Sequence, residues 1–143
     1  MATLDDAILL AVQAHHRQKD KVGAPYILHP LRAMLRMHSE QEMMAAVLHD
    51  VVEDSPHTLA DLEQAGYPRD VVEAVDCLTR REDETYDEFI ARIRPNALAR
   101  RVKLADLEDN MDLRRLAQLG DKEFERLQKY HRAWLNLMEE KTE

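Results

Sequence analysis

The sequence has little of what a β-sheet protein or a disulfide-stabilised domain requires. Glycine occurs only 3 times in 143 residues and aromatic residues make up 5% of the chain, so a β-barrel or sandwich would lack most of its usual turn and strand residues. The single cysteine excludes an intrachain disulfide. The composition, dominated by alanine and leucine, predicts an all-α fold, and the length predicts a single domain over residues 1–143.

The chain also lacks an excess of positive charge and a long apolar segment. Its 20 Lys and Arg residues against 28 Asp and Glu residues give a formal net charge of −8, which argues against wrapping duplex nucleic acid but allows a local basic pocket. No stretch reaches the roughly 18 apolar residues of a membrane span. Asp5 and Asp6 near the start, without a basic segment, are unlike a signal peptide. We therefore expect a cytoplasmic protein with neither nucleic-acid nor membrane partners.

Helix-start signals recur along the chain. Ser39 and Thr85 are each followed three residues later by a glutamate, Glu42 or Glu88, as in a capping box. Together with the apolar period of about 3.6 residues, such signals predict a compact bundle of about eight helices. The expected helices cover about 3–17, 30–37, 41–53, 58–66, 68–79, 85–94, 95–116 and 122–140.

A histidine and a cluster of acids follow an apolar run. The run 45–48 precedes His49 and Asp50, and Glu53 and Asp54 follow one turn later. Residues i and i+4 share a helix face, so these groups lie within reach of one another. Burying a carboxylate at the end of a buried helix costs on the order of several kcal/mol unless a positive charge compensates it. A metal ion would supply that charge; the alternative is a frayed acidic helix end with one half-buried histidine.

Two further positions favour the metal interpretation. His29 precedes Pro30 at the junction of a structured loop with the second expected helix, and Asp106 lies inside a helix with Asn110 one turn later. Imidazole and carboxylate suit divalent cations such as Mn, Fe, Zn or Mg. Two histidines and two aspartates also leave coordination positions open for water and substrate oxygens, as metal-assisted hydrolysis requires.

Three strings make the sequence resemble a known family. They are GAPYILHP at 23–30, LHDVVED at 48–54, and VKLAD at 102–106 with Asn110 after it. In this order they resemble the HD-domain metal phosphohydrolases and, more closely, the hydrolase domain of the Rel/SpoT alarmone enzymes, above all their small stand-alone relatives. The resemblance covers about residues 8–134 and implies an all-α HD-domain helical bundle. No part of the chain resembles the alarmone synthetase domain.

The resemblance implies a role for each matching residue. The positions that match the metal ligands are His29, His49, Asp50 and Asp106. Those that match the acidic pair, which handles the attacking water and proton transfer, are Glu53 and Asp54. Those that match or resemble substrate-contact positions are Lys19, Asn110, Arg126 and Tyr130. The implied cofactor is one divalent ion, most often Mn(II), and the implied reaction removes the 3′-pyrophosphate of (p)ppGpp to give GDP or GTP.

Some residues depart from the alarmone-hydrolase pattern and leave the substrate open. Gln18 stands beside Lys19, where an arginine against the purine is common, and Glu108 and Asp109 lie where a basic residue is usual. Acids near a polyphosphate would repel it unless they point to solvent. The alternatives are an HD-type nucleotidase or phosphatase acting on another nucleotide or phosphoester, and a module that senses a nucleotide without hydrolysing it. Homo-oligomer formation also stays open.

Several other polar residues also have expected positions or roles. His15 is expected on the surface or at the pocket rim. Tyr26 is expected to anchor its loop, with a substrate contact as the alternative. The basic residues Arg100, Arg101 and Lys103 precede Asp106 and are expected to face either phosphate or solvent.

Overall fold

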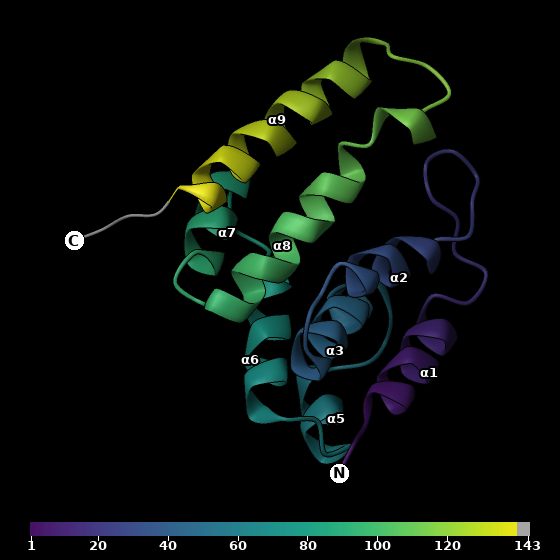
Figure 1. The fold of residues 1–143 in the computed structure, drawn as a ribbon, viewed down its shortest axis with the longest axis vertical. Helices are drawn as coiled ribbons and strands as arrows, with labels where there is room; N and C mark the ends of the chain where they lie inside the picture. The colour runs from purple at the N-terminus through teal and green to yellow at the C-terminus, as the bar shows by residue number, and fades with distance from the viewer. Residues whose placement is uncertain (140–143) are drawn as a thin grey trace.

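The computed structural model describes residues 1–139, which form nine α-helices and one 3₁₀ helix (Figure 1). Within these residues the only β-type pairing is an isolated bridge between Lys19 and Pro25, so the all-α expectation is confirmed. None of the helices in this range is both long and apolar enough to cross a bilayer. The elements are α1 (Leu4–Ala14), α2 (Leu28–Leu35), α3 (Glu40–Leu48), α4 (Val51–Asp54), α5 (Leu59–Gln64), α6 (Arg69–Leu78), α7 (Tyr86–Ile93), α8 (Ala97–Asn110), the 3₁₀ helix η1 (Leu113–Arg115) and α9 (Asp121–Met138).

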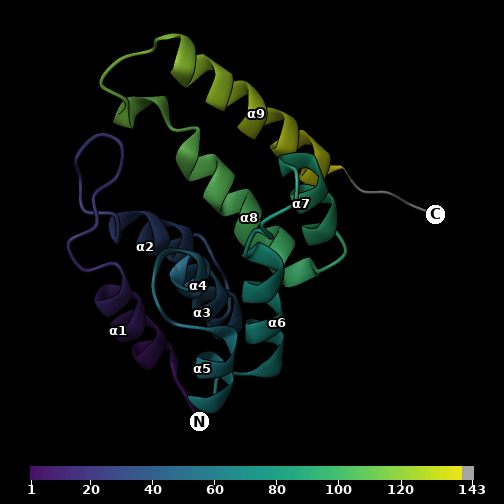
Figure 2. The same ribbon diagram turned by 180° about the vertical axis from the view of Figure 1, so that it is seen from behind.

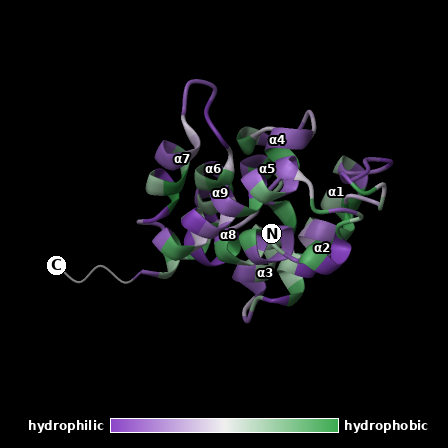
Figure 3. Ribbon diagram, turned by 90° about the horizontal axis from the view of Figure 1, so that it is seen from above, coloured by the Kyte–Doolittle hydropathy of each residue, from purple (hydrophilic) through white to green (hydrophobic). Residues whose placement is uncertain are grey.

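Helix α3 is the centre of the bundle. It packs against α1, α2, α6 and α8, and its residues 45–48 are completely buried. After a polar first turn, the segment 43–48 is apolar on all sides, and such a segment is stable only when other helices surround it. Helix α9 packs along α8 on the side of the molecule opposite α1 (Figure 1). Seen from above, hydrophobic and hydrophilic residues alternate along the helices (Figure 3), and the buried apolar residues form one core.

Local capping explains where several helices begin. Thr85 accepts the backbone N–H of Glu88 and the Glu88 side chain accepts the N–H of Thr85, so the expected capping box is present. Ser39 also caps its helix by accepting the N–H of Glu42. The Glu42 side chain, however, accepts the backbone N–H of His38 at 3.1 Å. The capping box expected at Ser39 is therefore only half formed, because the Glu42 side chain bonds to the N–H of His38 and not to that of Ser39.

Three expected helix boundaries are wrong in ways that matter for the site. The expected helix over 41–53 breaks after Leu48, and α4 begins at Val51 (Figure 2). The long helix expected to reach residue 116 ends at Asn110, where the side chain of Asp112 accepts the N–H of Arg114 and starts η1 instead. The second helix begins at Leu28, two residues before Pro30, so His29 belongs to its first turn.

Candidate metal centre and adjoining cleft

The break between α3 and α4 brings two adjacent side chains to one point. His49 is 2% exposed, and its Nδ1 lies 2.5 Å from the carbonyl of Ala46. Because a carbonyl can only accept, Nδ1 carries the proton, and in the neutral ring Nε2 keeps its lone pair. Asp50 places Oδ2 3.1 Å from this Nε2. In a continuous helix consecutive side chains diverge by about 100°, so the break allows the two groups to converge.

His29 from α2 and Asp106 from α8 complete the group. His29 Nε2 lies 2.7 Å from Asp106 Oδ1 and 4.0 Å from Asp50 Oδ2. His49 Nε2 lies 3.5 Å from the same Asp106 oxygen. His29 and Asp106 are both buried. The structure thus brings together the four side chains that the sequence predicts as metal ligands.

The chemistry of this donor set fits a divalent cation. His49 Nε2 is buried and makes no hydrogen bond, despite the approach of Asp50. A buried polar atom without a partner is costly, and coordination would satisfy it. Ligand atoms of His29, His49 and Asp50 all lie within 4.8 Å of one another, and nitrogen and oxygen donors of this kind suit borderline to hard divalent metals. These residues are therefore able to hold a metal ion.

Charge is balanced inside this group without a metal. Burial lowers the pKa of His29, but hydrogen bonds to two aspartates outweigh burial and raise the pKa to about 9. Burial raises the pKa of Asp50, but His49 outweighs it and lowers the pKa to about 2. Burial has the same raising effect on the pKa of Asp106, and Lys103, whose Nζ is 2.8 Å away, holds it well below its usual range. Protonated histidines thus act as counter-ions that a cation would replace.

The acidic pair on α4 divides between two surroundings. Asp54 lines a hollow together with Lys19 and Tyr26, and burial, reinforced by nearby carboxylates, raises its pKa to about 6. Glu53, which is exposed like Asp54, accepts the backbone N–H of Arg80 through its Oε1 at 2.9 Å. Asp54 therefore borders this hollow, whereas Glu53 holds the connection between α6 and α7.

A cleft of about 440 Å³ opens beside the metal-ligand group. Its lining includes four cationic side chains, Lys19, Lys21, Arg115 and Arg126, against one acid, Asp20. The chain as a whole carries a net charge of −8, so the cleft is a local reversal of charge. A concave site lined by one sign of charge attracts ligands of the opposite sign, which in this cleft means anions.

All four residues predicted as substrate contacts line this cleft. They are Lys19, Asn110, Arg126 and Tyr130. Asn110 also connects the cleft to the metal-ligand group, because its Nδ2 lies 3.3 Å from Asp106 Oδ1. Tyr26 does the same from the other side: it lines the cleft, and its hydroxyl donates to Asp50. An anion in the cleft would therefore lie against the metal-ligand group.

Known proteins are similar to this chain in sequence and in fold. No protein-family model matches the chain. It is 32% identical over 123 residues to the bifunctional (p)ppGpp synthase/hydrolase SpoT of Escherichia coli K12, and 33% identical over 118 residues to the guanosine-3′,5′-bis(diphosphate) 3′-pyrophosphohydrolase of Haemophilus influenzae. These matches take in 76% and 72% of the chain but 17% of each relative, so the chain spans about a sixth of the length of these curated relatives.

A solved structure agrees with these matches. It comes from a study of a metazoan ortholog of SpoT that hydrolyses ppGpp, and it aligns with a TM-score of 0.74 at 25% identity over 96% of this chain and 85% of that chain. The chain is homologous to the SpoT-type (p)ppGpp hydrolases. The resemblance drawn from the three sequence strings is thereby confirmed, and so is the HD-domain helical fold that it implied.

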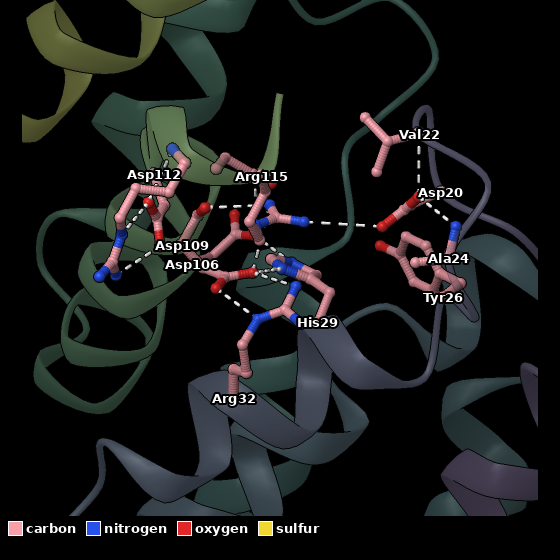
Figure 4. Close-up of polar contacts among 12 residues, drawn as sticks. Asp20, Val22, Ala24, Tyr26, His29, Arg32, Asp106, Asp109, Asp112 and Arg115 are labelled. Atoms are coloured by element: carbon pink, nitrogen blue, oxygen red, sulfur yellow. Dashed lines mark hydrogen bonds and ion pairs between the residues drawn. The ribbon is translucent and has the colours of Figure 1, made fainter. Parts of the chain in front are cut away.

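Two acids that depart from the SpoT-type pattern do not face the cleft together. Asp109 is 1% exposed, and its Oδ2 lies 2.6 Å from His29 Nδ1 (Figure 4). Arg32 donates to both Asp109 oxygens, at 2.7 and 3.0 Å. Both positions considered for Asp109, beside a polyphosphate or in solvent, are therefore wrong. Glu108 does point outward, with 44% of its side chain exposed.

A signal for the position of Asp109 was present in the sequence. Asp109 follows Asp106 by three residues, and on a helix that spacing places two side chains on the same face. The face of α8 that presents Asp106 to His29 therefore presents Asp109 to it as well, one on each ring nitrogen.

Gln18, which also departs from the SpoT-type pattern, makes hydrogen bonds within the protein. Gln18 donates to the carbonyls of Ala14 and Asp54, at 3.2 and 2.9 Å, and its Oε1 lies 2.8 Å from His15 Nδ1. His15 is 1% exposed and stacks obliquely on Tyr26, so its expected surface or rim position is wrong. A signal was present in the sequence: His15 follows the buried Ala11 by four residues and so shares its helix face, whereas His16 follows the exposed Val12 by four.

The basic residues before Asp106 do not form one surface. Lys103 is hydrogen-bonded to Asp106, Arg101 pairs with Glu42 at 3.0 Å, and Arg100 donates to backbone carbonyls at the end of α9. The expectation of phosphate or solvent is therefore wrong for Lys103, which is instead the counter-ion of Asp106, a metal-ligand candidate.

Proposed function

We propose that the chain is a metal-dependent phosphohydrolase that removes the 3′-pyrophosphate of (p)ppGpp, giving GDP or GTP and pyrophosphate. The observation that carries the proposal is the convergence of two histidines and two aspartates beside a cationic cleft. The substrate follows the relatives, since SpoT of E. coli is named a (p)ppGpp synthase/hydrolase and the metazoan ortholog is said to hydrolyse ppGpp. Residues 1–143 would form one hydrolase domain acting in the cytoplasm, where nucleotides are found.

The proposed metal ligands are His29 Nε2, His49 Nε2, Asp50 Oδ2 and Asp106 Oδ1. Mn(II) is the proposed ion, because a set of two nitrogens and two oxygens suits it and the resemblance to alarmone hydrolases favours it. When bound, a divalent cation activates water for attack and offsets negative charge on the phosphoryl oxygens.

Asp54 and Glu53 are the proposed acid–base pair. A pKa of about 6 leaves Asp54 ionised at neutral pH yet close to protonation, and proton transfer is most effective when the pKa lies near the working pH. Asp54 would take the proton of the water that attacks the phosphorus joined to the ribose, and would give it to the ribose 3′-oxygen as the bond between that oxygen and phosphorus breaks. Glu53 adds negative charge beside Asp54 and fixes the backbone at Arg80.

The cleft residues are proposed to bind the nucleotide. Lys19 and Arg126 supply positive charge for phosphate oxygens, and Tyr130 supplies an aromatic surface. Asn110 reaches both the cleft and Asp106, so it would hold the ribose or its phosphate next to the reacting bond. The burial of Asp109 supports an alarmone as substrate, because the acid expected to repel a polyphosphate is neutralised away from the cleft.

The decisive experiment is turnover of the purified chain with Mn(II), using ppGpp beside a panel of ordinary nucleotides. Pyrophosphate and phosphate are measured separately, with a metal-free sample and an Asp106→Asn variant as controls. Pyrophosphate released from ppGpp alone is the expected result. Phosphate released from another nucleotide, with none from ppGpp, would replace the proposal by a nucleotidase. Binding without turnover would indicate a sensing module.

A further inference from the structure

Asp109 is a buried ionised group that neither the core nor the proposed reaction requires. Burying a carboxylate costs on the order of several kcal/mol unless it is paired and hydrogen-bonded. Asp109 is 1% exposed and has three cationic or donor neighbours, Arg32, Arg115 and His29. A leucine could fill the same space without this cost. The arrangement therefore needs a reason other than packing.

The reason lies in the different partners of the two ring nitrogens of His29. Nε2 points to the proposed metal ligands, 2.7 Å from Asp106. Nδ1 points the opposite way, 2.6 Å from Asp109. We propose that Asp109 is the positioning residue of His29: by accepting the Nδ1–H it fixes the tautomer and the orientation in which Nε2 faces the cation. The inference rests on the proposed metal centre and adds a residue to it.

The second histidine also has a partner at Nδ1, but of a different kind. His49 uses a backbone carbonyl, that of Ala46, 2.5 Å from its Nδ1. His29 lies in the first turn of α2, and its Nδ1 bonds to Asp109 of α8, a residue 80 positions away in the chain. A side chain from another helix therefore takes the place that a carbonyl takes for His49. A metal-bound histidine generally donates its other N–H to a carboxylate or carbonyl in this way.

Two arginines hold the Asp109 carboxylate in the required plane. Arg32 contacts both oxygens through Nε and Nη2, a bidentate geometry that fixes the rotation of the carboxylate. Arg115 Nη2 lies 3.5 Å from Oδ2 and donates to the backbone carbonyl of Asp109. Neither arginine makes a hydrogen bond to His29, so their effect on it passes through Asp109 (Figure 4).

The test measures metal affinity, which a merely structural carboxylate would not alter. Mn(II) alone is titrated into wild type, Asp109→Leu, Asp109→Asn and Glu108→Gln, and free Mn(II) is followed by its EPR signal. Asp109→Leu is expected to weaken Mn(II) binding about 10- to 100-fold. Asp109→Asn keeps an acceptor oxygen and is expected to recover part of that loss. Glu108→Gln, the exposed neighbour on the same helix, is expected to bind as wild type does.

A double variant separates positioning from folding. Asp109→Leu leaves Arg32 unpaired and lowers stability, whereas Arg32→Leu/Asp109→Leu replaces the pair by apolar side chains and should regain stability. Thermal unfolding checks the recovery. We expect Mn(II) affinity to stay weak in the double variant, because Nδ1 still lacks its acceptor. Wild-type affinity in either Leu variant would overturn the inference and leave the proposed function standing; absence of Mn(II) binding in wild type would overturn both.

Discussion

Two regions of the molecule contain arginine–carboxylate pairs of the same geometry but with different neighbours. In the metal-ligand region, Arg32 grips Asp109 through Nε at 2.7 Å and Nη2 at 3.0 Å. In the connection between α6 and α7, Arg92 grips Glu84 through the same two atoms at the same two distances. The pairs differ in what else they touch. Asp109 contacts His29, whereas Arg92 also donates to the carbonyls of Asp76 and Thr79.

This difference separates interactions that serve a site from interactions that serve the fold. The Arg92 pair closes a loop by satisfying backbone carbonyls at the end of α6, and no residue of the metal group takes part. The Arg32 pair satisfies no backbone group and instead directs a carboxylate at a histidine. Substitutions at the Arg92–Glu84 pair should therefore mainly cost stability, and those in the metal-ligand region should also cost metal binding or turnover.

The largest effect is expected for Asp106→Asn. The amide keeps the size of the side chain but removes a charge from a proposed metal ligand, so Mn(II) binding and hydrolysis should both fall below detection. The control is Asp112→Asn, just after α8, where the carboxylate pairs with the exposed Arg114. Mn(II) titration and pyrophosphate release measure the outcome, and circular dichroism shows whether the fold persists. Full activity in Asp106→Asn would remove this residue from the ligand set.

Substitutions of the acidic pair should lower turnover without releasing the metal. Glu53→Gln keeps an oxygen for the N–H of Arg80 and Asp54→Asn keeps its shape, so each removes little but charge. We expect kcat to fall by about 10²- to 10⁴-fold, the usual contribution of a general acid or base, with Mn(II) affinity unchanged. A full rate in Glu53→Gln would show that the role assigned to this residue is wrong.

Glu84→Gln should act on the other region. The substitution leaves Arg92 half-buried with a weakened partner, and we expect a loss of roughly 1.5–3 kcal/mol in the free energy of unfolding, as for a hydrogen bond to a charged group. Urea unfolding measures this loss. Glu82→Gln, two residues away and exposed, is the control. Turnover per folded molecule should match wild type, and a selective loss of kcat would mean that the loop reaches the reaction.

The pH dependence of stability should identify the same pair. The hydrogen bond from Arg92 holds the pKa of Glu84 at about 2, below its ordinary value of 4.5. A lowered pKa in the folded state means that the contribution is complete above about pH 4.5 and is lost as the pH falls toward 2. The stability difference between wild type and Glu84→Gln should therefore be constant from pH 7 to 5 and shrink below that. A difference that grew on acidification would contradict the assignment.

The smallest effect is expected at a third ion pair, next to the loop. Arg81 and Asp76 approach to 2.7 Å, but both side chains are more than 40% exposed. Exposed pairs of this kind contribute little because water and salt screen them. Asp76→Asn should change the free energy of unfolding by at most about 0.5 kcal/mol, measured by urea unfolding beside Glu84→Gln. A loss as large as that of Glu84→Gln would show that burial is not what distinguishes the two pairs.

Local signals explain which parts of the fold could be predicted. The capping box at Thr85 depends only on residues within one turn, and it forms as expected. The break after Leu48 could not be predicted, because the run 41–53 contains no glycine or proline and its apolar period is uninterrupted. The break is instead associated with tertiary contacts: His49 is buried against His29 and Asp106, which come from other helices.

The site shows the same limit. The order of His29, His49, Asp50 and Asp106 and the resemblance to a family predicted which residues meet, although spacing alone could not, since 77 positions separate His29 from Asp106. The outer partners were missed. Asp109 was interpreted from its charge and its neighbours in the sequence, whereas its position depends on which face of α8 meets α2.

The separation of the metal-ligand candidates along the chain also has a consequence for the stability of the fold. One ion at this site would join α2, the α3–α4 junction and α8, closing a loop of 77 positions between His29 and Asp106. A cross-link over so long a loop restricts the unfolded chain far more than it restricts the native one. A cation bound only by the folded chain would then add to its stability, and a chelator should lower the free energy of unfolding as well as stop turnover.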